Sequence, residues 1–272
     1  MSRRSKRRAV MLGLALSVLA SALYAHDLFI KLNSFFLAPG AAVKVPVLNG
    51  TFSSSENAIA RERIADLSLV TSAGRSHLDT TIVSARHDTT FLDVRLGGAG
   101  TYVLGMSTLP SEIALAGKQF TEYLEEEAIT EIVEQRAKAG ISADSARERY
   151  SKHVKAIFQV GAERTNDFAT ALGYPAELVP LDNPYALKPG DTLRIRALVD
   201  GRPVAGQPVL AGGRTGTGAR IAARQITTNQ EGVAALPLTP RGRWYVKFIR
   251  MVPKGDNHNY ESKWATMTFE VR

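Results

Sequence analysis

The chain has 272 residues, of which 44% are hydrophobic and 22% charged, a composition typical of a globular protein rather than a disordered, collagenous or coiled-coil chain. It contains no cysteine, which excludes disulfide frameworks, cysteine-ligated metal centres and thiol nucleophiles. The formal net charge is +8, but five of the basic residues lie within the first eight positions.

The first 25 residues have the three parts of a secretory signal peptide. A basic segment is followed by the apolar run Val10–Leu19 and by small residues that end at Ala25. The run is shorter than the roughly 20 residues needed to span a bilayer, so we predict cleavage after Ala25 and a periplasmic mature protein without a transmembrane span. Taking these five basic residues from the total of 34 leaves 29 against 26 acidic residues, which argues against a nucleic-acid partner.

Residues 26–110 alternate between apolar and polar positions in short segments, a pattern that predicts β-strands. The segments are Asp27–Leu32, Ala42–Leu48, Ile64–Val70, Thr89–Leu96 and Thr101–Met106. Turn sequences such as Pro39-Gly40 and Asn49-Gly50 separate them. We therefore expect an antiparallel β-sandwich over residues 26–110.

Residues 111–157 change to helical spacing and predict a helical hairpin between two β-regions. Apolar residues follow this spacing from Phe120 to Ala137, and Gly140 ends the first helix. Ser142 is a suitable N-cap for a second helix through Val154. The acidic run Glu125–Glu127 lies on consecutive helical positions about 100° apart, so we expect a solvated face there rather than a cation site.

Residues 158–272 return to strand patterns and predict a second sandwich. The strand-like segments are Asp191–Val199, Gly206–Leu210, Ile221–Thr228, Gly232–Leu238, Arg243–Ile249 and Tyr260–Val271. The glycine-rich segment Gly212–Gly218 lacks the lysine of a phosphate loop and is interpreted as a hairpin loop. The predicted fold class is thus mainly β, with two antiparallel β-sandwich domains of immunoglobulin-like or transthyretin-like type and an intervening helical hairpin.

Several motifs are distributed along the mature chain. They are Ala25–Phe29, Phe35–Leu37, Asn49–Phe52, Tyr123–Glu127, Arg147–Lys152, Gly173–Leu181, Asn183–Leu187 and Tyr260–Thr266. Their combination resembles a family of exported bacterial proteins labelled NikM-like, after a proposed nickel-transport component. The resemblance implies an envelope-located, metal-linked β-sandwich protein. Separately, Asp200–Val209 and Gly242–Val246 resemble transthyretin-like and Cna-B-like sandwich modules, which are mostly structural or adhesive.

His26 would become the mature N-terminus and could then supply two metal ligands, the α-amine and the imidazole Nδ1, which close a chelate ring on one ion. Their ordinary pKa values, about 7.7–8.0 and about 6.5, allow both to lose protons near neutrality. Nitrogen ligands of this kind favour nickel, cobalt or copper over magnesium or calcium. Asp27 could add a carboxylate or orient the ring. The other candidate ligands are His258 in a loop and His153 on the predicted second helix, with His77 and His87 as alternatives.

Two hypotheses follow. The first is a periplasmic accessory protein that captures or delivers nickel, cobalt or copper through His26, with a metal transporter or an outer-membrane receptor as partner. The second is a non-enzymatic envelope module that binds a protein or polysaccharide. Catalysis is not predicted, because the chain contains neither a Gly-x-Ser-x-Gly elbow nor a His-Glu-x-x-His motif.

Overall fold

The computed structural model describes residues 26–272, so the predicted signal peptide and its cleavage site after Ala25 lie outside the described residues. Within this range the chain forms eighteen β-strands and two α-helices. The prediction of a mainly β fold of sandwich type is confirmed. Each of the strand-like segments identified from the sequence coincides with a strand of the structure.

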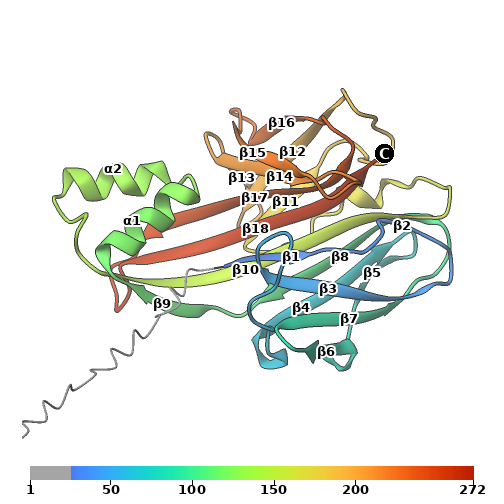
Figure 1. Ribbon diagram of the computed structural model, residues 1–272, viewed down its shortest axis with the longest axis horizontal. Helices are drawn as coiled ribbons and strands as arrows, with labels where there is room; N and C mark the ends of the chain where they lie inside the picture. The colour runs from blue at the N-terminus through green and yellow to red at the C-terminus, as the bar shows by residue number, and fades with distance from the viewer. Residues whose placement is uncertain (1–25) are drawn as a thin grey trace, which may run out of the picture.

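A ten-stranded sheet runs through the molecule and forms its framework (Figure 1). Eight strands follow one another in the order β15 (Arg220–Thr227), β14 (Pro208–Arg214), β17 (Gly242–Pro253), β18 (Tyr260–Val271), β10 (Ala146–Val160), β8 (Gly100–Thr108), β4 (Ile64–Thr71) and β5 (Gly74–His77). The short strands β2 (Phe36–Leu37) and β9 (Ser111–Leu115) also pair with β10. This sheet therefore joins strands from both ends of the chain.

Two smaller sheets lie on either side of the long strands (Figure 1). One contains β1 (Asp27–Ile30), β3 (Ala42–Gly50), β7 (Thr89–Arg95) and β6 (Val83–Arg86). The other contains β11 (Ala176–Pro180), β12 (Thr192–Val199), β13 (Arg202–Pro203) and β16 (Val233–Pro237). Apolar side chains of the three sheets form one continuous core, as expected when the hydrophobic faces of sheets pack together.

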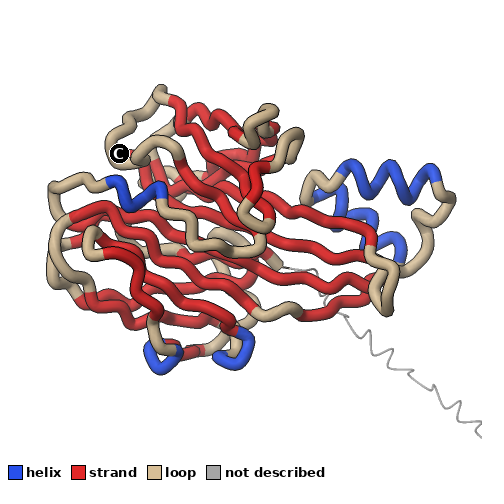
Figure 2. The backbone as a smooth tube through the Cα atoms, turned by 180° about the vertical axis from the view of Figure 1, so that it is seen from behind, coloured by secondary structure: helices blue, strands red, loops and turns tan. Residues whose placement is uncertain are grey.

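The helices α1 (Gly117–Glu126) and α2 (Thr130–Lys138) stand at one end of the molecule, away from the C-terminus (Figure 2). Their buried side chains Phe120, Leu124 and Ile132 form a second core with Trp264 of β18. Three 3-10 helices complete the structure at Arg61–Arg63, Thr80–Ile82 and Asn166–Ala169. Across residues 26–272, no helix has the length and apolar character required to cross a membrane.

The predicted second helix from Ser142 through Val154 is wrong, because residues 146–160 form strand β10. This strand pairs in parallel with β18, from Glu148 opposite Tyr260 to Ala156 opposite Thr268. Every residue from position 151 to position 160 is buried, since sheets cover both faces of the strand. Polar side chains at buried positions gave the segment the sequence pattern of a helix with one solvated face.

Candidate functional site

Strand β1 has a fixed place between two other strands. It pairs antiparallel with β3, from Asp27 opposite Gly50 to Ile30 opposite Val47. On its other side the Thr266 hydroxyl of β18 donates a hydrogen bond of 2.6 Å to the Leu28 carbonyl, and the Thr268 hydroxyl donates to the Ile30 carbonyl. The position of residue 26, directly before β1, is therefore set by both β3 and β18.

The loop after β3 folds back to place a carboxylate beside His26. Gly50 makes this turn possible, because a Cβ there would lie 2.7 Å from the Ser54 carbonyl oxygen and 3.2 Å from the Glu56 nitrogen. The Glu56 amide donates to the Asn49 carbonyl at 2.9 Å. As a result, Glu56 Oε2 lies 3.3 Å from His26 Nε2.

This contact involves one ring nitrogen of His26 and leaves Nδ1 out of the ion pair. Nδ1 is the nitrogen that can share a chelate ring with the α-amine of the same residue. In many metal sites a carboxylate beside the second ring nitrogen of a histidine ligand orients the imidazole. The sequence analysis considered Asp27 for this orienting role, whereas the structure places Glu56 at the ring.

Asp27 contacts a different part of the molecule. Its Oδ2 lies 2.6 Å from Lys247 Nζ, and the same ammonium lies 2.6 Å from Glu127 Oε2. The second oxygen, Asp27 Oδ1, is buried without a hydrogen-bond partner. Glu127 thus lies in a buried ion pair, and the expectation of a solvated face is wrong for this residue. Burial and the Asp27 charge raise the pKa of Glu127 to about 7, against the opposing effect of Lys247.

Lys152 of β10 contacts the backbone of residue 26. Its ammonium donates to the His26 carbonyl and, at 3.2 Å, to Asn49 Oδ1. The residue is only 5% exposed, and its Nζ lies 5.3 Å from the ring centroids of Tyr150 and Trp264. Burial lowers the pKa of Lys152 to about 8, although nearby carboxylates, Asp27 foremost, oppose this shift.

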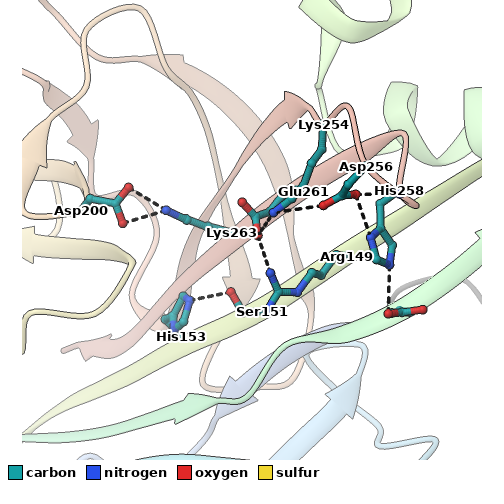
Figure 3. A network of polar contacts seen from close by, with 10 residues as sticks. Arg149, Ser151, His153, Asp200, Lys254, Asp256, His258, Glu261 and Lys263 are labelled. Carbon is teal, nitrogen blue, oxygen red and sulfur yellow. Dashed lines mark hydrogen bonds and ion pairs between the residues drawn. The ribbon is translucent and has the colours of Figure 1, made fainter.

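His153 also lies in β10, but both of its ring nitrogens are engaged elsewhere. Nδ1 lies 2.9 Å from the Ser107 hydroxyl and Nε2 lies 3.0 Å from the Ser151 hydroxyl. Burial lowers the pKa of this imidazole to about 4, so it is neutral at pH 7. Figure 3 shows the pair of His153 and Ser151 apart from the network around His258.

His258 lies in the loop between β17 and β18, within a network of charged side chains (Figure 3). Its Nδ1 is 3.1 Å from Asp256 Oδ1. Its Nε2 is 2.9 Å from Glu112 Oε1, an ion-pair distance without the angle of a hydrogen bond. A further histidine, His77, contacts Asp66 at 2.7 Å.

The structure places the four predicted ligands in separate contacts. His26 lies beside Glu56 and Asp27 beside Lys247, while His153 and His258 belong to two further networks. Between residues 26 and 272, no three His, Asp or Glu side chains are grouped as a metal cage. Sequence reasoning missed Glu56, Glu127, Lys152 and Lys247, which the fold brings to this region. The only local signal for them was the Asn49-Gly50 turn, which predicts that the chain reverses just before Glu56.

These observations define a mainly β-sandwich protein whose first described strand is set against the central sheet. Residues 23–251 match a family described as "Domain of unknown function (DUF4198)". The match covers most of the sequence, so the chain belongs to the DUF4198 family. A search of curated proteins found no match.

Two solved structures illustrate the likeness to other proteins. Trypsin-activated α-2-macroglobulin from Escherichia coli is 11% identical, with a TM-score of 0.22, over 90% of this chain and 16% of that one. The BSP domain of a biofilm-associated protein is 9% identical, with a TM-score of 0.18, over 86% of this chain and 29% of that one. The chain spans well under two thirds of either protein, and TM-scores this low do not define a shared fold.

Proposed function

We propose that this protein is a periplasmic accessory protein that binds nickel, cobalt or copper through His26, once cleavage after Ala25 has made it the N-terminal residue. The α-amine and Nδ1 of His26 would hold the metal, and as nitrogen donors they suit these ions. The observation that carries the proposal is the contact of 3.3 Å between His26 Nε2 and Glu56 Oε2. It places a carboxylate beside Nε2 and leaves Nδ1, the nitrogen that can join the chelate ring, outside the ion pair.

Two neighbouring groups add support. Asp27 Oδ1 is a buried carboxylate oxygen without a hydrogen-bond partner, and buried polar atoms normally have one. Lys152 donates to the His26 carbonyl, which restrains the backbone of the residue that would carry the metal. In this proposal the nitrogen donors of His26 hold nickel, cobalt or copper, and Asp27, whose Oδ2 pairs with Lys247, would add a donor only through its unpaired Oδ1.

The resemblance to NikM-like proteins extends the proposal to nickel or cobalt transport. In this form the protein would deliver its metal to a metal transporter or accept it from an outer-membrane receptor. It would act by binding and release, without catalysis. The alternative, an envelope module that binds a protein or polysaccharide, is favoured if the test below fails.

The test uses protein exported with its own N-terminal segment, whose intact mass gives the first residue. Copper(II) and nickel(II) are titrated into this protein and into a variant with one extra residue before His26. We expect the affinity to fall by at least about a hundredfold, because the extension keeps the imidazole but moves the amine out of the chelate ring. Glu56→Gln should weaken binding about tenfold by loosening the ring.

His258→Ala is the matched control, because it removes an imidazole that lies in a different network. Its titration curve should equal that of the unmodified protein. If the extended variant binds metal as tightly as the native protein, or if the mature chain does not begin at His26, the chelate does not exist and the binding-module alternative becomes the working hypothesis.

A further inference from the structure

A small cavity lies beside residue 26 and carries two cationic side chains. Its volume is about 220 Å³, and its polar lining comes from Asn49, Arg63, Thr108, Tyr150 and Lys152, with the segment 58–60 closing it. The lining combines the end of β3, the loop before the first 3-10 helix and the central strands β8 and β10. Parts of the chain far apart in sequence thus form one pocket.

Arg63 has an unused hydrogen-bond donor. Its Nη2 donates to the Leu109 carbonyl at 2.9 Å, while its Nε is buried without a hydrogen-bond partner. Leaving a buried donor unpaired costs free energy, and such groups are uncommon in folded proteins. Because a guanidinium presents its donors as a rigid fork, the ligand that suits it best is a planar oxyanion that accepts two hydrogen bonds.

Lys152 supplies the second cation of the cavity. Its ammonium is bonded to two neutral oxygens, the His26 carbonyl and Asn49 Oδ1. Among the ion pairs of residues 26–272, none involves Lys152 or Arg63. Asp27 and Glu148 act on Lys152 electrostatically from a distance, but no carboxylate in the described part of the chain forms an ion pair with either cation of the pocket, which leaves room for a ligand carboxylate in direct contact with both.

We propose that this cavity binds a small monocarboxylate between Arg63 and Lys152. The volume limits the ligand to a few heavy atoms, since pockets for larger ligands start at roughly 300 Å³. A single negative charge is favoured over the multiple charge of phosphate, because Asp27 and Glu148 already interact electrostatically with Lys152. The same carboxylate chemistry is present in a free organic acid and at the C-terminus of a peptide. The proposal does not depend on metal binding at His26.

The test is calorimetric titration of metal-free mature protein with sodium acetate, at low ionic strength. Acetamide serves as the uncharged analogue, sodium phosphate as the multiply charged anion, and Gly-Gly as the peptide carboxylate. We expect one acetate per chain, no binding of acetamide and weaker binding of phosphate. Binding of Gly-Gly in place of acetate would identify a peptide terminus as the source of the carboxylate, and binding of acetate alone would identify a free acid.

The variants Arg63→Met and Lys152→Met should each weaken acetate binding at least about tenfold. Arg149→Met is the matched control, because Arg149 lies in the same strand β10 but pairs with Glu261 outside the cavity. A direct readout is the NMR signal of the Arg63 Nε–H group, which should shift when acetate is added. Arg63 is not fully buried, so its variant tests the proposal even if Lys152→Met does not fold.

Two results would overturn the proposal. One is the absence of binding by both acetate and Gly-Gly, together with an Arg63 Nε–H signal that neither of them changes. The other is binding that persists in Arg63→Met, or that is equally strong for phosphate, since either would indicate general attraction to a basic surface.

Discussion

Strand β10 contains two buried lysines, three positions apart, that differ in how their charge is compensated. Lys155 Nζ lies 2.5 Å from Glu177 Oε1, and the two side chains are only 2% and 1% exposed. Lys152 is almost as buried but donates to neutral oxygens beside a cavity. Residues three apart on a strand point to opposite faces, so the two lysines enter different layers of the molecule.

At the Lys155 site, the remaining hydrogen-bonding capacity of Glu177 is also satisfied. Its two carboxylate oxygens also accept hydrogen bonds from the backbone nitrogens of Leu172 and Gly173. The pair with Lys155 is therefore satisfied by the protein alone and has a structural role. The contrast with Lys152 shows that a buried charged side chain indicates a ligand site only where the protein provides no ion-pair partner for it.

The largest expected effect comes from breaking the complete pair. Lys155→Met leaves Glu177 charged and unpaired in the core, and should lower the free energy of unfolding by about 3–5 kcal/mol. Urea denaturation followed by circular dichroism measures this loss. The double variant Lys155→Met/Glu177→Leu should recover most of it, because an apolar pair of similar volume carries no unpaired charge. A loss below about 1 kcal/mol for the single variant would contradict the structural role.

His153 is a further buried titratable residue of β10. It differs from both lysines because its side chain is neutral at pH 7. Burial lowers its pKa from 6.5 to about 4 in the folded protein. Between these values the unfolded chain binds the proton and the folded chain does not, so its contribution to stability falls as the pH falls from 6.5 to 4. The loss is about 3 kcal/mol over this range.

The pH dependence of His153→Gln isolates this contribution. The variant cannot take up the proton, so the stability difference between wild type and variant should shift by about 3 kcal/mol in favour of the variant as the pH falls from 6.5 to 4. Denaturation curves at a series of pH values measure the difference. A difference that stays constant with pH would show that His153 has an ordinary pKa.

A smaller effect is expected for Lys152→Met, the same substitution made three positions earlier. The buried ammonium has no directly paired carboxylate to leave behind, and a well-packed apolar side chain can replace such a charge at little cost. The free energy of unfolding should change by no more than about 1 kcal/mol. Denaturation beside Lys155→Met provides the comparison, and equal losses for the two variants would remove the distinction drawn between the sites.

The smallest effect is expected at the partly exposed pair of Arg149 and Glu261, whose side chains are 40% and 29% exposed. Solvent screens ion pairs of this kind. Arg149→Met should therefore change the free energy of unfolding by less than about 0.5 kcal/mol, again measured by urea denaturation. A larger change would show that the network around His258 contributes to the stability of the fold.

The sequence predicted the structure correctly where the conformation of a segment depends on residues close to it in the chain. Period-two patterns and turn residues identified most of the strands, and the apolar spacing from Phe120 to Ala137 identified a helical region, which was predicted as one helix but is divided into α1 and α2. It failed at β10, because Lys152 and Lys155 resemble surface residues when their burial is unknown. The paired strand β18 is more than 100 positions away, and no local pattern reports such a partner.

In the candidate site, too, only the features that depend on nearby residues could be predicted from the sequence. His26 could be proposed from the sequence because the proposed chelate depends only on its predicted position after the cleavage site. Glu56 lies 30 residues further on, and its approach to His26 depends on a backbone turn at Gly50 that leaves no room for a side chain. Lys152 and Lys247 reach the site from the central sheet, so their role could be recognised only once the sheet order was known.

The two threonine hydrogen bonds that hold β1 also determine when residue 26 can reach its place. Thr266 and Thr268 contact carbonyls 238 residues earlier in the chain. Synthesis proceeds from the N-terminus, so the first described strand has to wait for almost the whole chain before these contacts can form. Closing a contact over such a long stretch of chain carries a large entropic cost. Strand β1 is thus made early but reaches its full set of contacts only after β18 is present, and a ligand that needs residue 26 in its final position requires the folded C-terminal strands.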